Sequence, residues 1–341
     1  MRYGKFLSPG GTIGVTAPSY GASAEPYITR TAKAKEFFEK EGFRVRMGET
    51  VYKGDGIGIS TDPRVCGKEL TEFYCGKDND IIISAGGGEL MCETIDHVDW
   101  EKLKNADPKW YLGYSDNTNM TFLLPTLCDT AALYGYCFGT FGRTPMDASA
   151  KDFCRFLTGG APFSHSYEKY QPVDLQEPED PAAPFSFTEP SMISCYQWDG
   201  IPIEGRFLGG CLDLLTMYPG TCYDRVRAFN ERYQEDGTVW FLEACDLNVY
   251  GIRRALWILK HAGWFETAKG FLIGRPLCMG QTTFDGLNQY NAVLDVLEDL
   301  NVPILMDLDI GHVPPQMPII SGGYGRVFRE HGQVQIVFEL K

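Results

Sequence analysis

The segment Trp110-Tyr-Leu-Gly-Tyr-Ser-Asp-Asn-Thr118 carries the clearest strand-to-helix signal in the chain. Its first five residues are apolar or aromatic, which is typical of a short buried strand. Ser115 follows at once, and the next three residues are types whose side-chain oxygens cap helices. This order predicts a sharp turn from a strand into a helix. Ser115 on that turn is either a helix cap or a nucleophile close to free helix amides.

Strand and helix patterns alternate along the rest of the chain. Apolar runs predict strands, 3.6-residue spacings predict helices, and the alternation resumes after a middle segment rich in Pro, Glu and Asp. This order is typical of parallel sheets covered by helices. We therefore predict an α/β fold with domains at 1–165 and 201–341, joined by a linker or long loop at 166–200. Strands are expected at 12–17, 43–47, 81–84, 110–114, 239–243, 270–274 and 303–306.

Composition bounds the class of protein. A chain of 341 residues is long for one core, and 44% hydrophobic with 22% charged residues is ordinary for a globular protein. The formal net charge of −14 argues against nucleic acid and against an anionic membrane surface as partners. No apolar run approaches the length of a membrane span. We therefore expect a soluble, cytoplasmic protein that binds neither nucleic acid nor membrane.

Cysteine and histidine patterns indicate neither a disulfide framework nor a metal site. The 11 cysteines are irregularly spaced and include no Cys-x-x-Cys pair, so free thiols in a reducing compartment are expected. The 5 histidines show no paired spacing of the kind that binds zinc. We expect no metal and no cofactor.

A run of glycines, Gly86–Gly88, follows the apolar strand at 81–84. It matches neither the dinucleotide fingerprint nor a phosphate P-loop. It is therefore either a tight turn or a segment whose amides, at Gly87 and Gly88, form part of an oxyanion hole. Ligands of open parallel sheets gather at the carboxyl ends of the strands, where both this run and Ser115 are expected.

Two further strand-end residues have the chemistry of an acid–base pair. Glu243 ends the apolar strand at 239–243, and His312 follows Gly311 in a loop made rigid by two prolines. Each has a structural alternative, as a surface carboxylate or a loop histidine. Together with Ser115 they supply a nucleophile, a base and a carboxylate that orients the base. The order Ser, Glu, His also occurs in α/β-hydrolases, but Ser115 lacks the glycine two positions on that their elbow uses.

The chain resembles the LD-carboxypeptidase family of serine peptidases, which includes the microcin C self-immunity peptidases. The length and the region around Trp198 are more similar to that immunity branch than to the shorter murein-recycling branch. The Gly-Tyr-Ser-Asp segment, the strand-end Glu and the Gly-His pair are specific in combination. The matching segments are Thr12-Ile-Gly-Val-Thr-Ala-Pro-Ser19, Trp110–Thr118, Phe241-Leu-Glu243, Gly270–Pro276 and Asp309-Ile-Gly-His312.

The resemblance implies a serine carboxypeptidase with a triad of Ser115, Glu243 and His312. It implies an oxyanion hole from the amides of the glycine run and of Asp116, a flavodoxin-like N-terminal domain, a swivelling β/α C-terminal domain and a homodimer. The chain departs from the family after the glycine run, where Glu89-Leu-Met replaces a polar segment followed by Arg-Leu-Leu. A hydrolytically inert two-domain binding protein and an α/β-hydrolase-like esterase are the alternatives.

The substrate is left open between two amides. One is the L,D bond before the terminal D-amino acid of a murein tetrapeptide, whose free carboxylate would call for a cation such as Arg275. The other joins a peptidyl or aminoacyl group to a nucleotide, on which an aromatic side chain, Trp198 or Tyr196, could stack. Arg275 is equally well interpreted as part of a domain-interface ion pair, and the two aromatics as packing residues. The length favours the nucleotide or another bulky amide.

Overall fold

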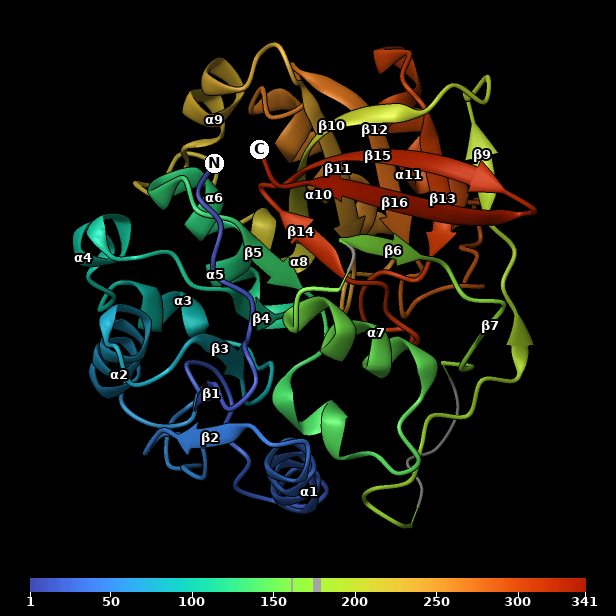
Figure 1. Cartoon of the computed structure of the whole chain (residues 1–341). Coiled ribbons are helices and arrows are strands. Elements are labelled where there is room, and N and C mark those ends of the chain that lie inside the picture. Colours follow the sequence, from blue (N-terminus) through green and yellow to red (C-terminus); the bar gives the residue numbers. More distant parts are fainter. Residues whose placement is uncertain (161, 174–178) are drawn as a thin grey trace. The chain divides into compact units, whose positions relative to one another are not determined.

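The computed structural model describes residues 1–160, 162–173 and 179–341, and it divides them into two compact units. Unit 1 comprises the described residues of 1–161 and 176–185, and unit 2 those of 162–175 and 186–341. Both units combine helices with a sheet that contains parallel strands (Figure 1). The predicted two-domain α/β class is confirmed.

Unit 1 is built on a parallel sheet with the strand order β2-β1-β3-β4-β5. This is the flavodoxin-like order predicted for the N-terminal domain. The strands are β1 (Thr12–Thr16), β2 (Arg44–Met47), β3 (Ile81–Ser84), β4 (Tyr111–Gly113) and β5 (Ala132–Tyr134). The helices are α1 (Tyr27–Lys40), α2 (Pro63–Cys75), α3 (Met91–Ile95), α4 (Trp100–Asn105), α5 (Thr118–Thr121), α6 (Leu123–Cys128) and α7 (Ala148–Leu157), with 3-10 turns η1 (Ser115–Asn117) and η2 (Phe138–Gly142).

Local sequence explains these elements well. The residues of β1 and β3 are buried throughout, as expected where helices cover both faces of a parallel sheet. Helix α2 begins at Pro63 directly after Asp62, whose carboxylate accepts from the amide of Arg64 at 2.8 Å. A proline at the first helical position after an acidic cap is a strong start signal.

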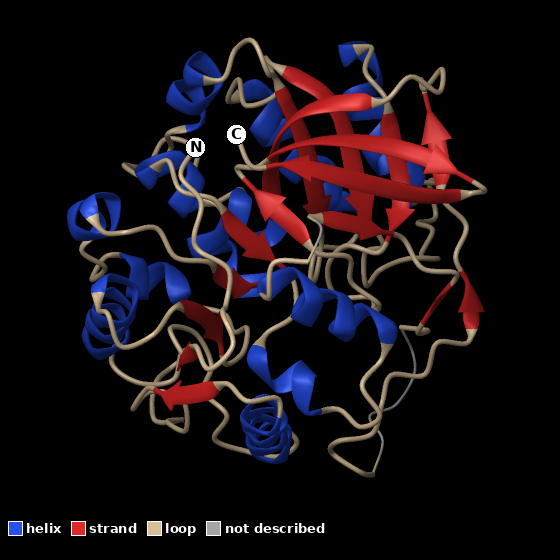
Figure 2. Ribbon diagram, in the orientation of Figure 1, coloured by secondary structure: helices blue, strands red, loops and turns tan. Residues whose placement is uncertain are grey.

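Unit 2 is built on a mixed sheet with the order β6-β16-β15-β10-β11-β12-β13-β9. The central strands β10 to β13 run parallel, and the others are antiparallel to their neighbours. Figure 2 shows these strands in one broad, curved sheet with helices beside it. The strands of unit 2 are β6 (Phe163–His165), β7 (Lys169–Tyr170), β8 (Glu189–Pro190), β9 (Ser194–Tyr196), β10 (Ile203–Cys211), β11 (Thr238–Glu243), β12 (Ala268–Gly274), β13 (Ile304–Leu308), β14 (Ile319–Ser321), β15 (Tyr324–Glu330) and β16 (Gln333–Glu339).

The helices of unit 2 follow the parallel strands in the chain, and they are α8 (Leu212–Leu215), α9 (Val226–Arg232), α10 (Val249–His261), α11 (Gln289–Leu297) and the 3-10 turn η3 (Glu298–Leu300). The antiparallel strands were not predicted. Strand β16 alternates buried residues with partly or fully exposed ones, which is the pattern of a half-buried antiparallel strand. The range 166–200, predicted as a linker or long loop, contains β7, β8 and β9.

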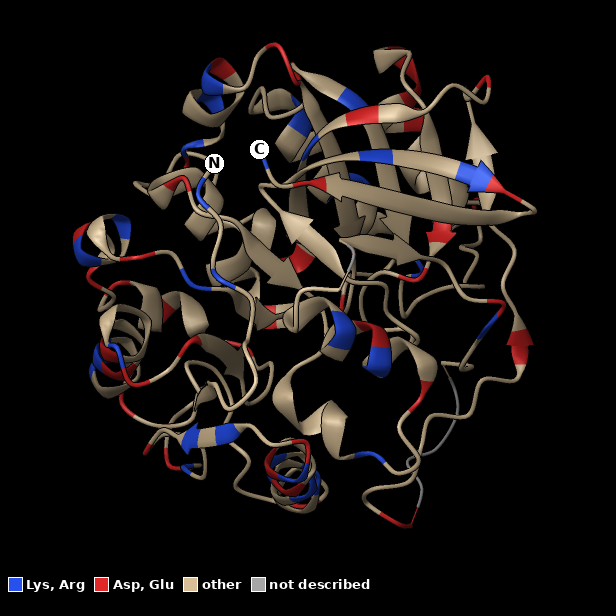
Figure 3. Ribbon diagram, in the orientation of Figure 1, with Lys and Arg blue, Asp and Glu red and all other residues tan. Residues whose placement is uncertain are grey.

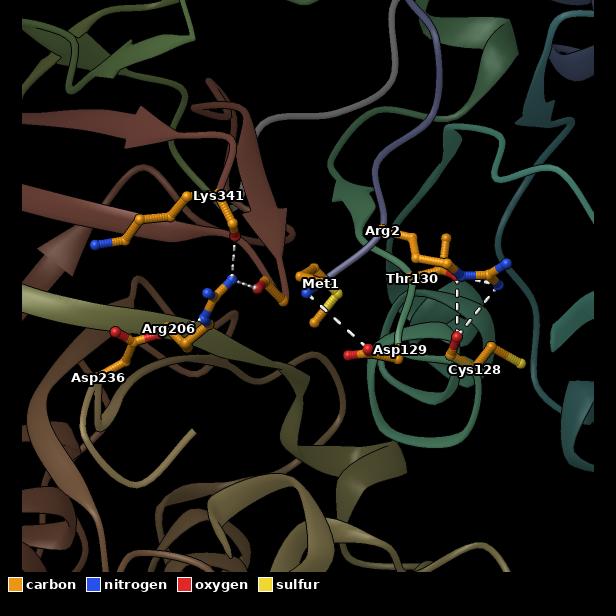
Figure 4. Close-up of polar contacts among 9 residues, drawn as sticks. Met1, Arg2, Cys128, Asp129, Thr130, Arg206, Asp236 and Lys341 are labelled. Atoms are coloured by element: carbon orange, nitrogen blue, oxygen red, sulfur yellow. Dashed lines mark hydrogen bonds and ion pairs between the residues drawn. The ribbon is translucent and has the colours of Figure 1, made fainter. Parts of the chain in front are cut away.

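The two ends of the chain are each held by polar contacts within their own unit (Figure 4). In unit 1 the guanidinium of Arg2 donates to Oγ1 of Thr130 at 2.7 Å. In unit 2 Arg206 donates to the carbonyl of Lys341 at 3.0 Å and pairs with Asp236 at 2.8 Å. Helix α1 carries Lys, Arg and Glu side chains (Figure 3), and the basic ones predominate, so the acidic balance of the chain is not concentrated there.

Candidate active site

Ser115 lies on a strained turn after β4, where η1 begins. Its φ is 62°, a left-handed conformation that non-glycine residues adopt only at some cost. The turn is closed by the amide of Asn117, which donates to the carbonyl of Tyr114 at 3.1 Å. A serine in this conformation between a strand and a helix is the arrangement found at nucleophile elbows.

The glycine run packs against Ser115 inside unit 1. A Cβ added to Gly87 would lie 3.1 Å from Cβ and 3.2 Å from Oγ of Ser115. A Cβ on Gly88 would overlap Oγ of Ser19 and lie 2.8 Å from the amide nitrogen of Tyr20. The absence of side chains is therefore what allows the backbone of this run to approach the serine.

Asn117 ties the glycine run to the serine turn. Its Nδ2 donates to the carbonyl of Gly86 at 2.8 Å, and its Oδ1 accepts from the hydroxyl of Tyr111 at 2.6 Å. Gly86 follows β3, Tyr111 lies in β4, and Asn117 lies in the turn that follows β4, so the contacts join two loops at the carboxyl edge of the sheet in unit 1. The side chain thus fixes the spacing between the two loops that hold Ser115 and Gly87.

Asp116 is fully buried directly behind Ser115. Its Oδ2 accepts from Oγ of Ser19 at 2.5 Å and from the amide of Met91 at 2.9 Å, and its Oδ1 accepts from Nδ2 of Asn119 at 3.0 Å. Burial raises the pKa of this carboxyl to about 6, although the hydrogen bonds from Ser19 and Met91 oppose the shift. Its side chain anchors the turn, and its backbone amide is the predicted oxyanion donor.

Unit 2 brings Glu243 and His312 together. Nδ1 of His312 donates to Oε2 of Glu243 at 2.8 Å, the carboxylate is buried at the end of β11, and the imidazole is 13% exposed. Gly311 has a φ of 95°, and a Cβ there would overlap the Glu243 carboxylate. Burial lowers the pKa of His312 and is the largest single influence, but the Glu243 carboxylate and the neighbouring Cys245 together hold that pKa well above its usual range.

Cys245 is a neighbour of His312 that no sequence motif had indicated as a site residue. A side-chain hydrogen bond links its thiol to the imidazole, while burial raises the pKa of the thiol. The loop after Glu243 is fixed by Asp213, whose carboxylate accepts from the amides of Cys245, Asp246 and Leu247 at 3.0, 2.9 and 3.1 Å. The one available signal was position, because Cys245 stands two residues after the strand-end Glu243.

Arg275 is not a free cation. Its Nη1 pairs with Oδ1 of Asp309 at 2.6 Å, and the side chains are 1% and 0% exposed. Its Nη2 donates to Oγ of Ser191 at 2.8 Å, and its guanidinium lies 4.4 Å from the ring centroid of Tyr170. All four residues belong to unit 2. Arg275 therefore forms an ion pair, but the pair lies within unit 2 and is not the domain-interface pair predicted as the alternative.

Trp198 lies at the other end of the sheet in unit 2. It lines a pocket of 880 Å³ with residues that precede or begin the parallel strands, such as Asp236 and Lys269. Glu243 ends β11, about 16 Å along that strand from its first residue. The structure does not bring Trp198 close to Glu243 and His312. Trp198 therefore offers no stacking surface to a nucleotide bound beside that pair. Tyr196, in β9, pairs with Ile304.

Among residues 1–160, 162–173 and 179–341, no group of three or more His, Cys, Asp or Glu side chains is placed to hold a metal ion. No helix in these ranges is both long enough and apolar enough to cross a membrane.

A flavodoxin-like unit with a strained strand-end serine, and a mixed-sheet unit with a buried Glu–His pair, define a two-unit α/β protein of hydrolase type. Residues 13–135 match the N-terminal domain of LD-carboxypeptidases, and residues 204–327 match the C-terminal domain. The two matches cover more than half of the chain, which therefore belongs to the LD-carboxypeptidase family.

Relatives with names or solved structures resemble the chain over nearly its whole length. The microcin C7 self-immunity protein MccF of Escherichia coli is 24% identical over 333 residues, which are 93% of this chain and 90% of that protein. The structure of MccF with glutamyl sulfamoyl guanosine has a TM-score of 0.81 at 21% identity, covering 98% of both chains. An MccF-like protein from Bacillus anthracis str. Ames also has a TM-score of 0.81, at 19% identity over 99% of this chain and 100% of that one.

Proposed function

We propose that the protein is a serine-type carboxypeptidase that hydrolyses an amide bond with Ser115, His312 and Glu243. The observation that carries this proposal is the 2.8 Å contact between Nδ1 of His312 and Oε2 of Glu243. That contact places the proton of the neutral imidazole on Nδ1, so Nε2 carries the lone pair that a general base needs. The left-handed turn at Ser115 supports the assignment of the nucleophile.

In the proposed reaction, Nε2 of His312 accepts the proton of the Ser115 hydroxyl as Oγ attacks the carbonyl carbon. The amides of Gly87, Gly88 and Asp116 would donate to the oxyanion that forms. The imidazolium then passes its proton to the leaving nitrogen, and the amide bond breaks to leave an acyl-serine. Water, activated by the same imidazole, releases the acid and restores Ser115.

We infer that the substrate is an aminoacyl or peptidyl group joined to a nucleotide, or a comparably bulky amide. Family membership and the likeness to MccF over nearly the whole chain support this choice. Solved relatives hold such ligands, since MccF was obtained with aspartyl sulfamoyl adenosine and an MccF-like protein from Streptococcus pneumoniae with AMP. The burial of Arg275 in an ion pair gives no support to its role as a carboxylate anchor for a murein peptide.

Substrate class is tested by incubating the purified protein with aspartyl sulfamoyl adenosine and, in parallel, with murein tetrapeptide. Mass spectrometry should detect free aspartate and sulfamoyl adenosine. Release of terminal D-alanine without attack on the adenosine compound would instead place the protein among murein peptidases. Tight binding of the adenosine compound without any product would favour the inert binding protein.

The triad is tested with Ser115→Ala, His312→Ala and the double variant. Each single change should lower kcat on the order of 10³-fold or more, and the double variant should lose little beyond either single change. This non-additivity is expected because both residues act in one step. Losses that multiply, or a Ser115→Ala protein with wild-type turnover, would contradict the mechanism.

A further inference from the structure

His312 lies in a loop that begins at Asp309 and returns to it through a backbone hydrogen bond from Met317. The carbonyl of Asp309 accepts from the amide of Met317 at 2.8 Å, which closes the loop at its base. Within the loop, Nε2 of Gln316 donates to the carbonyl of Gly311 at 2.7 Å. The orientation of Asp309 therefore sets the direction in which the loop carries His312.

Asp309 is held mainly through its carboxylate. Oδ1 pairs with Nη1 of Arg275 at 2.6 Å, and Oδ2 accepts from the amide of Tyr167 at 2.6 Å. The register of the sheet places the two charged residues side by side, because Gly274 of β12 pairs with Leu308 of β13 and each charged residue comes next. The amide of Arg275 also donates to the carbonyl of Leu308 at 3.2 Å.

The ion pair of Arg275 and Asp309 is almost completely buried. Removing two charges from water is costly, and apolar residues of the same size often stabilise a fold as well as a buried pair does. Here burial raises the pKa of Asp309, and the Arg275 guanidinium opposes that shift. A planar guanidinium held by Asp309, Ser191 and the Tyr170 ring has little freedom to rotate. Such a rigid group can hold the Asp309 carboxylate in one orientation.

We propose that Arg275 is a positioning residue, which through Asp309 holds the His312 loop in register with Glu243. Arg275 does not touch the substrate. It acts on His312 indirectly, through Asp309 and the loop, in the way that hydrogen-bond partners of catalytic groups fix the orientation of an imidazole ring. The kinetic consequences rest on the proposed function, whereas the effect on the Glu243–His312 contact does not.

Imidazole NMR tests the positioning directly. The chain has 5 histidines, and His312 is assigned by the signal that disappears in His312→Asn. In Arg275→Met the pKa of His312 should fall, because a loosened loop weakens the contact with the Glu243 carboxylate that raises it. Arg275→Lys should fall between that variant and wild type. Arg253→Met, which breaks the exposed pair with Asp295, is the matched control and should leave the His312 titration unchanged.

Kinetics separate positioning from substrate binding. In Arg275→Met, kcat should fall at least tenfold, since a displacement of about 1 Å can cost roughly 10²-fold, while KM should change less than about threefold. A large rise in KM with kcat preserved would show that Arg275 binds the substrate carboxylate and would overturn the proposal.

Removal of one partner alone leaves a buried charge, so Arg275→Met could lose its fold. The paired variant Arg275→Met with Asp309→Leu carries no unpaired charge and should remain folded by circular dichroism. It should still show the lowered His312 pKa. A wild-type His312 titration in a folded Arg275→Met or paired variant would overturn the proposal, whether or not the protein hydrolyses any substrate tested.

Discussion

A Cβ atom on Gly87 would lie 3.1 Å from Cβ of Ser115 and 3.2 Å from its Oγ. These separations are tighter than most real Cβ contacts, so one of the two loops would have to give way. The backbone of Gly87 is thus as close to the serine hydroxyl as a residue without a side chain allows. An oxyanion donor beside a nucleophile needs this kind of approach.

Gly87→Ala should therefore impair catalysis with little loss of stability. The added methyl group would push the Ser115 hydroxyl or the Gly87 amide out of place, and kcat should fall roughly 10- to 100-fold. The matched control is Gly139→Ala in the same unit, where the nearest atom to a new Cβ is 3.6 Å away. Turnover and thermal unfolding of both variants are the measurements. Wild-type kcat in Gly87→Ala would remove this segment from the proposed site.

The pH profile should report the raised pKa of His312. His312 must be neutral to accept a proton, so kcat/KM should rise with pH through its pKa, with a midpoint above the ordinary value of 6.5. Glu243→Gln removes the carboxylate that raises this pKa, and its midpoint should move to lower pH. The kcat/KM of the wild type and the residual kcat/KM of Glu243→Gln are measured from pH 5.5 to 9.5. A wild-type midpoint at or below 6.5 would contradict the role of the pair.

Asp116 should make unit 1 less stable as the pH rises. Its folded pKa of about 6 lies above the ordinary 3.8, so the folded state binds the proton more tightly. The stability gained from protonation is therefore complete below about 4 and is lost as the pH rises through about 6, a change of about 3 kcal/mol.

The side chain in Asp116→Asn cannot titrate. The unfolding temperature of this variant, relative to that of the wild type, should therefore rise as the pH increases from 4.5 to 7.5. A constant difference across this range would contradict the assignment.

Chelation should not affect turnover. The proposed mechanism uses a serine, an imidazole and backbone amides, and it assigns no step to a metal ion. Protein treated with EDTA and then dialysed should retain the full kcat of untreated protein. A loss of activity that added zinc restores would show that a metal takes part.

The family resemblance predicts a homodimer. Light scattering at micromolar concentration should give twice the chain mass of 38.2 kDa. The measurement is repeated over a tenfold dilution series to separate a stable dimer from weak association. A mass of one chain throughout would refute the predicted dimer.

The α/β class and most parallel strands could be predicted because their signals are local. A run such as 81–84 is apolar within a few residues, and the caps and glycines that end each element stand beside it. The turn at Ser115 also follows from neighbours, since a strand meets helix-capping residues there. The antiparallel strands β15 and β16 escaped prediction because their alternating pattern gives no indication of which strand they will pair with.

The partners of the functional residues were decided by the tertiary structure. Glu243 and His312 stand 69 positions apart, and Arg275 and Asp309 stand 34 apart, so their contacts depend on the order and register of strands β11, β12 and β13. Local sequence predicted that Arg275 and Trp198 lie near strand ends. It did not predict which charged residue would pair with Arg275, or at which edge of the sheet Trp198 would lie. Strand order and register come from packing the whole sheet at once, because each strand is fixed by hydrogen bonds to neighbours far away in the chain.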